Sequence, residues 1–214
     1  MLHKNLFPLV ALLTLAPAAY AVPDANGNIP AGPPRAGGAP RAQGAGPADP
    51  AMAVKNYKVG YEEWQMATLL EKSATGLSGE EGMRRKEAVT AGFTRARDKF
   101  RSATASDPNM KEAWNMLGFT SRMLGKYEDS LEAYEKALAL SPDYPEAIEY
   151  RAELYLLTGR LAQVKEAYAY LQKSTPSYAE VLKTSMKDWV KAKKPVQGLS
   201  DADRAEFTSW VAKL

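Results

Sequence analysis

The chain of 214 residues contains no cysteine and a single histidine, His3. Without cysteine the protein has no disulfide bond, no thiol nucleophile and no thiolate metal ligand. His3 lies in an N-terminal segment that we expect to be cleaved, so the remaining chain has no imidazole either. Gly-x-Ser-x-Gly, Ser-x-x-Lys and phosphate-loop motifs are also missing. These absences predict a protein that is not an enzyme and has no catalytic, cofactor-binding or metal-binding residues.

Long apolar runs are scarce, and the one at residues 6–18 is shorter than the ~20 residues that a membrane-spanning helix needs. Lys4 precedes this run and Ala19-Tyr20-Ala21 follows it, a pattern typical of a secretory signal peptide. We expect residues 1–21 to be cleaved after Ala21, leaving a protein without stable membrane insertion. The alternative is an uncleaved anchor. Because no cysteine follows, a bacterial lipoprotein anchor is excluded. The expected location is periplasmic, in a Gram-negative bacterium, or secreted.

Residues 22–50 are rich in proline, glycine and alanine, and Val22 and Ile29 are their only large aliphatic side chains. Such a segment buries too little apolar surface to offset the entropy of ordering it, so we predict a disordered tether. Export and the absence of a recognition motif argue against nucleic acid as a partner.

The remaining chain contains two tandem segments of 34 residues, 111–144 and 145–178, that align with one another. A fixed period of this length is typical of helix-turn-helix solenoids. The aligned pairs are Trp114 with Ile148, Gly118 with Ala152, Gly125 with Gly159, Tyr127 with Leu161, Tyr134 with Tyr168, Ala137 with Leu171 and Pro142 with Pro176.

This repeat resembles the tetratricopeptide repeat (TPR) family. Its motif positions are occupied by Trp114-x2-Leu117-Gly118, Gly125-Lys126-Tyr127, Tyr134, Ala137 and Pro142. The resemblance implies an all-α, short TPR-like solenoid that binds proteins, and the signal peptide makes it an exported bacterial type. We expect Gly118 to allow close helix approach and Gly125 to end a helix in the left-handed region. An ordinary helical bundle with accidental self-similarity is the alternative.

Weaker patterns extend the solenoid in both directions. Residues 51–110 are predicted to form a divergent N-terminal repeat, with a first helix over about 51–74 and a second starting from a capping box at Ser78 and Glu81. Residues 179–214 are predicted to form C-terminal capping helices. In the last of these, Phe207, Trp210, Val211 and Leu214 make a narrow apolar edge that either folds back on the solenoid or binds a partner.

Members of the family usually bind partners in a concave groove lined by the first helix of each repeat. The acidic residues of this groove favour a basic or extended partner segment over a peptide carboxylate. The alternative is that Phe119 and Met123 are covered by the N-terminal helices. The residues that the resemblance places in the groove are Glu112, Asn115, Phe119, Arg122, Met123, Glu146, Glu149 and Glu153. Glu149 and Glu153 are one turn apart, a spacing compatible with acid/base chemistry, but we expect them to face solvent.

Charge is nearly balanced overall but unevenly distributed, with a basic block at residues 84–101 and an acidic block at 126–149. The blocks could orient a charged partner or stack molecules head to tail, or simply form a solvated surface. We therefore predict a protein-binding adaptor or scaffold of the cell envelope. Two alternatives remain: a self-assembling structural module that forms a homo-oligomer, and a receptor for peptidoglycan or another glycan that uses Trp64, Tyr150 and Trp210.

Overall fold

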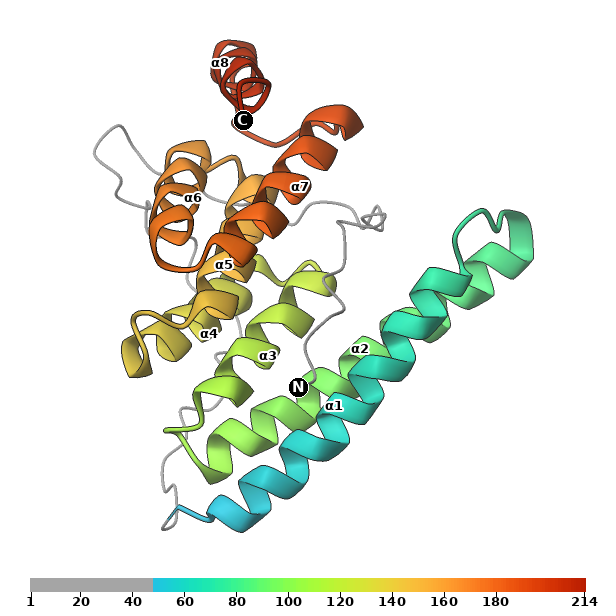
Figure 1. Cartoon of the computed structure of the whole chain (residues 1–214). Coiled ribbons are helices and arrows are strands. Elements are labelled where there is room, and N and C mark those ends of the chain that lie inside the picture. The colour runs from blue at the N-terminus through green and yellow to red at the C-terminus, as the bar shows by residue number, and fades with distance from the viewer. Residues whose placement is uncertain (1–47) are drawn as a thin grey trace.

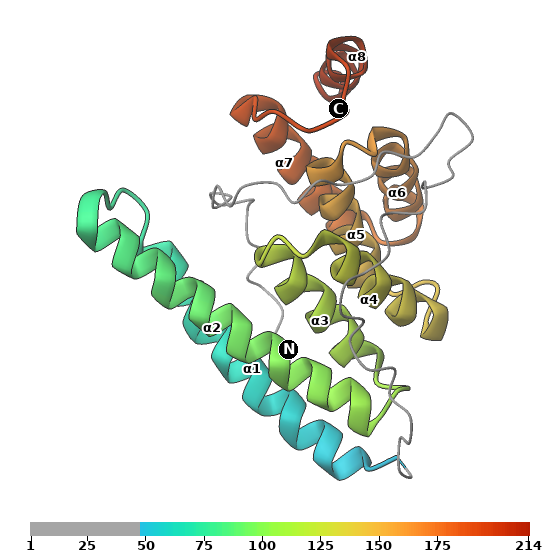
Figure 2. The ribbon, with the colours of Figure 1, turned by 180° about the vertical axis from the view of Figure 1, so that it is seen from behind.

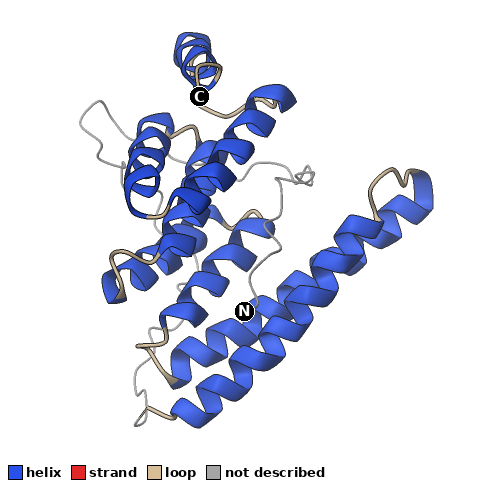
Figure 3. Cartoon of the chain, viewed as in Figure 1, coloured by secondary structure: helices blue, strands red, loops and turns tan. Residues whose placement is uncertain are grey.

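The computed structural model describes residues 48–214, and within this range all regular structure is α-helical, which confirms the predicted fold class (Figure 3). The predicted signal peptide and all but the last residues of the predicted tether lie outside this range. The helices are α1 (Pro50–Ser73), α2 (Gly79–Ser106), α3 (Lys111–Met123), α4 (Tyr127–Leu140), α5 (Pro145–Thr158), α6 (Leu161–Ser174), α7 (Pro176–Ala192) and α8 (Asp201–Val211).

The helices stack in sequence order as a TPR-like solenoid. The two helices of each pair pack against each other, in α1/α2, α3/α4 and α5/α6. Helix α7 follows as an additional helix that packs against α5 and α6. Figure 1 shows α1, α3, α5 and α7 following one another through the molecule. Helices α3 and α5 begin at Lys111 and Pro145, the first residues of the two predicted repeats.

Three glycines explain why the repeats take this form. Gly159 caps α5 with a φ of 74°, in the left-handed region that favours glycine, and Gly125 at the α3–α4 turn has a φ of 70°. At Gly118, a Cβ would lie 2.6 Å from the ring of the fully buried Tyr134. The close approach of α3 and α4 therefore requires a residue without a side chain, as predicted.

The N-terminal pair is longer than the other repeats. Helices α1 and α2 have 24 and 28 residues, against 13 and 14 for α3 and α4. The hairpin consequently reaches well beyond α3, as the view from behind shows (Figure 2). The predicted capping box is wrong: Ser78 is the N-cap residue, but its side chain makes no capping hydrogen bond. The chain enters α2 through Gly79 with a φ of 63°, so the Ser78 hydroxyl is not set over the first turn.

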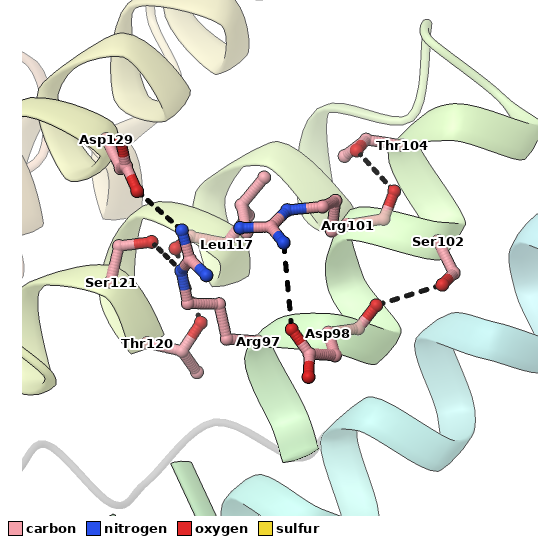
Figure 4. Close-up of polar contacts among 9 residues, drawn as sticks. All are labelled: Arg97, Asp98, Arg101, Ser102, Thr104, Leu117, Thr120, Ser121 and Asp129. Atoms are coloured by element: carbon pink, nitrogen blue, oxygen red, sulfur yellow. Dashed lines mark hydrogen bonds and ion pairs between the residues drawn. The ribbon is translucent and has the colours of Figure 1, made fainter. Parts of the chain in front are cut away.

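Helix α2 is joined to the first repeat by a buried guanidinium. Arg97 donates to the Ser121 hydroxyl of α3 at 2.9 Å and forms an ion pair with Asp129 of α4 (Figure 4). Arg97 belongs to the basic block of the sequence and Asp129 to the acidic block. At this point the two blocks neutralise each other within one chain.

The C-terminal end is closed by α8. Phe207 and Val211 are buried, and the Phe207 ring meets Trp189 of α7 in an edge contact at 5.5 Å between centroids. Trp210 packs edge-on against Tyr168 of α6 at 5.8 Å. The apolar edge of α8 therefore folds back on the solenoid, which is one of the two arrangements expected from the sequence.

No helix within residues 48–214 is long and apolar enough to cross a lipid bilayer.

Candidate partner-binding face

The first helices of the successive repeats line one face of the solenoid. Helix α3 contacts α5, and α5 contacts α7, while side chains of α1 reach α3 at Trp64 and Phe119. We call the side chains of α1, α3, α5 and α7 on this side the first-helix face. It is where the resemblance places the partner-binding residues.

The structure brings the predicted groove residues onto this face, at different depths. Asn115, Phe119, Arg122, Glu149 and Glu153 are buried within the chain itself, whereas Glu112, Met123 and Glu146 are half-buried. The expectation that Glu149 and Glu153 face solvent is wrong, because neighbouring helices cover both. Contact between a partner and these residues stays a prediction, and only the half-buried ones offer surface to it directly.

An ion pair between Arg122 and Glu153 lies at the centre of the face. The Arg122 guanidinium is 2.7 Å from Oε2 of Glu153, and the two side chains are 5% and 6% exposed. Ser185 of α7 donates to Oε1 of Glu153 at 2.6 Å. Burial lowers the pKa of Arg122, but Glu153 and other neighbours more than offset this and raise it. Arg122 is therefore charged, and the ion pair, with Ser185, ties α3, α5 and α7 together.

Glu149, one turn before Glu153, is 1% exposed, and neither carboxyl oxygen has a hydrogen-bond partner. Burial raises its pKa well above the ordinary value, and the nearby Glu153 carboxylate raises it further. A protonated Glu149 can donate to Glu153, which resolves the close approach of two carboxyl groups. Glu71 of α1 is similar, since burial raises its pKa to about 7 although Arg122 opposes the shift.

A ladder of aromatic rings runs along α1 and crosses to α3 and α5. Its successive ring centroids are 6.2, 4.9, 5.9 and 5.1 Å apart. Phe119 lies between Trp64 of α1 and Tyr150 of α5, and Arg122 lies 5.0 Å from its ring centroid. The alternative in which an N-terminal helix covers Phe119 is thus the observed arrangement. In order, the ladder contains Tyr57, Tyr61, Trp64, Phe119 and Tyr150.

A second group lies where α3, α5 and α7 begin. Burial raises the pKa of Tyr57 to about 12, with smaller contributions from Tyr61, Glu112 and Glu146. Burial also raises the pKa of Tyr144 and Tyr178, and Glu146 acts on both hydroxyls. These mutual electrostatic effects link the five side chains. We call Tyr57, Glu112, Tyr144, Glu146 and Tyr178 the tyrosine–carboxylate cluster; all five are half-buried.

The three tyrosines of this cluster were missed from the sequence. For two of them a signal was present, because Tyr144 and Tyr178 are one 34-residue period apart, as are Glu112 and Glu146. No such signal marks Tyr57, because the N-terminal hairpin does not follow the period.

A different surface, a trough of about 250 Å³, lies on the N-terminal hairpin. Met66, one of the side chains that line it, is 57% exposed. The trough is lined by Val59, Glu62, Glu63, Met66, Leu70 and Arg95.

Within residues 48–214, no three histidine, cysteine, aspartate or glutamate side chains come close enough together to hold a metal ion. The Glu149 and Glu153 carboxyl groups can share a proton, but both are enclosed, and Glu153 is already bonded to Arg122 and Ser185. Their chemistry in this structure is internal to the protein.

The comparisons with known proteins point in the same direction. Residues 122–159, which span the end of α3 and all of α4 and α5, match the family model described as TPR repeat. Comparison with curated proteins found no similar sequence. The match supports a protein of the TPR family, whose repeats mediate protein–protein interactions.

Proposed function

We propose that this chain is a non-catalytic adaptor of the cell envelope that binds a segment of a partner protein along its first-helix face. The observation that carries the proposal is the tyrosine–carboxylate cluster. Equivalent positions of successive repeats present half-buried tyrosine and glutamate side chains on one side of the solenoid. A linear segment running across the repeats would meet the same kind of side chain at each one.

The periplasm, or the exterior of the cell, is the proposed location. Lys4, the apolar run and Ala19-Tyr20-Ala21 support it, because together they make a signal-peptide pattern. The proline- and glycine-rich residues 22–50 would then separate the solenoid from the cleavage site.

The absence of catalysis is supported by residue chemistry. The chain after residue 21 offers no imidazole and no thiol. The most strongly perturbed carboxyl group, Glu149, is enclosed among α3, α5 and α7 side chains, where no substrate meets it directly.

The strength of binding follows from the size of the face. A site of two to three repeats would bury less than ~1,200 Å² in total, at the low end of specific interfaces. We therefore expect a transient complex, or one strengthened by several simultaneous contacts.

The test is photo-crosslinking in the native cell from a photoreactive amino acid in place of Glu112. The matched control replaces Glu132, an exposed glutamate of α4 outside the first-helix face. We expect a distinct protein adduct, identified by mass spectrometry, from the Glu112 position and none from the control. The same adducts from both positions, or none from the Glu112 position, would contradict the proposal.

Self-association is a second candidate function, favoured by the trough on the N-terminal hairpin. The exposed Met66 lines it together with Glu63 and Arg95, which pair at 2.8 Å and could exchange partners between two copies. Sedimentation at increasing concentration tests it, with Met66→Glu as the disrupting variant. A constant monomer mass for the unmodified chain would remove this candidate.

A further inference from the structure

We infer that the tyrosine–carboxylate cluster binds a lysine or arginine side chain of the partner segment. The inference rests on the proposed function and specifies the chemistry that the first-helix face recognises. Three observations support it: uncompensated negative charge, aromatic walls, and a buried acceptor without a donor.

The first observation is the charge. Glu112 and Glu146 take part in none of the ion pairs within residues 48–214. One cation lies at this end of the face, Lys111, whose ammonium donates to the Ser141 hydroxyl at 3.3 Å. Two carboxylates and one ammonium leave a net negative charge at this end of the face, which attracts a cationic group.

The second observation is the aromatic surroundings. Tyr57, Tyr144 and Tyr178 belong to the same cluster as the two carboxylates, and all three are half-buried. Rings attract cations through their electron-rich faces, most strongly where water is partly excluded. Lys111 already uses this contact, since its ammonium lies 4.8 Å from the centroid of the Tyr144 ring. A second cation from a partner would find the same type of surface on the neighbouring tyrosines.

The third observation points to a missing donor. Asn115 lies one turn beyond Glu112 on α3, is 3% exposed, and interacts with the Tyr144 hydroxyl. Its Oδ1 is buried without a hydrogen-bond partner, an arrangement that costs free energy. Below the half-buried Glu112 carboxylate, therefore, the face holds a buried acceptor without a donor.

Lysine and arginine side chains match this set of acceptors. An ammonium supplies three N–H donors and a guanidinium five, and neither has an acceptor. Hydrogen bonds from such groups to carboxylates are short and about twice as strong as neutral ones. An acidic partner segment would instead add negative charge to a site that already has an excess.

The experiment measures fluorescence anisotropy of labelled peptides added to the full chain. The probe is an unstructured glycine/serine peptide with alternating lysines, and its matched controls carry glutamine or glutamate at the lysine positions. The test variant is Glu112→Gln/Glu146→Gln, which removes two charges and keeps side-chain volume. The control variant is Glu132→Gln/Glu135→Gln, which removes two exposed charges from α4.

We expect the lysine peptide to bind the unmodified chain, and the Glu112→Gln/Glu146→Gln variant to bind it about tenfold more weakly. We expect the α4 variant to bind it unchanged. Circular dichroism melting of both variants establishes that each is folded. Equal weakening in both variants would overturn the inference, because the effect would then come from overall charge. Absence of binding between the lysine peptide and the unmodified chain would overturn it as well.

Failure of the inference is distinguishable from failure of the proposed function. If the glutamine peptide binds as well as the lysine peptide, and crosslinking from the Glu112 position still captures a partner, the face binds proteins but does not select cations. If no partner is captured from the Glu112 position either, the proposed function fails with the inference.

Discussion

At the scale of single residues, the most consequential feature is the sharing of one arginine by two carboxyl groups. Arg122 pairs with Glu153 at 2.7 Å, while Glu149 lies beside Glu153 with no donor of its own. Taking charges out of water costs several kcal/mol per ion, and this cost is offset only by good pairing. One positive charge can compensate one negative charge, so the second carboxyl group is stabilised as the neutral acid.

This arrangement predicts unequal effects for the two members of the ion pair. Arg122→Met leaves the buried Glu153 carboxylate unpaired and should lower the free energy of unfolding by about 3–5 kcal/mol. Glu153→Gln should cost less, because Glu149 can ionise and take the place of Glu153. Urea denaturation at neutral pH measures both. The double variant Glu149→Gln/Glu153→Gln should lower the free energy of unfolding about as much as Arg122→Met does. Equal losses for Arg122→Met and Glu153→Gln would contradict this account.

The same carboxyl group predicts a dependence of stability on pH. Because the folded state raises the pKa of Glu149, it binds more protons than the unfolded chain does above the ordinary value of 4.5. Its contribution to stability is therefore full below that value and is lost as the pH rises. Glu71 acts in the same direction between 4.5 and about 7.

Glu149→Gln mimics the protonated carboxyl group and donates to Glu153 at any pH. Relative to the unmodified chain, we expect it to be neutral near pH 4 and stabilising at pH 7.5 by on the order of 1 kcal/mol, the net size of one hydrogen bond. Urea denaturation at the two pH values checks this, with the exposed Glu132→Gln as control. A pH-independent difference would show that Glu149 does not titrate differently in the folded state.

At the scale of the helices, the regular repeats could be predicted and the N-terminal hairpin could be predicted only in part. The 34-residue period locates α3 and α5, because their turn glycines and small residues have fixed structural roles. The period fails before residue 111, so the contact between Trp64 and Phe119 has no sequence signal. The groove residues are buried by that contact and by α7. Because the sequence does not show how these elements pack, Glu149 and Glu153 were expected to face solvent.

The close contact between α3 and α4 gives a prediction for this scale. Gly118→Ala places a methyl group 2.6 Å from the ring of Tyr134, which is fully buried and cannot move aside. Overpacking of this kind costs about 1–3 kcal/mol, so the melting temperature should fall. Gly125→Asn is the matched control, because nothing lies within 4 Å there and asparagine tolerates a positive φ. An unchanged melting temperature for Gly118→Ala would mean that the two helices are further apart than described.

At the scale of the whole molecule, the two ends of the solenoid differ. The C-terminal end is closed, since α8 buries Phe207 and Val211 against the preceding helices. The N-terminal end extends as the α1–α2 hairpin, with exposed Met66, Leu69 and Met83 (Figure 1). Between them, Arg97 and Asp129 neutralise part of the two charge blocks. The first-helix face retains unpaired carboxylates, which is why we place the partner there.

The central claim is that a partner lies across the first helices of successive repeats. The most direct measurement is amide hydrogen exchange of the full chain, with and without the protein captured by crosslinking from the Glu112 position. We predict slower exchange in the first turns of α3, α5 and α7 and in the middle of α1, with α4 and α6 unchanged. Protection confined to α4 and α6, or to the outer end of the α1–α2 hairpin, would contradict the claim and place the partner elsewhere.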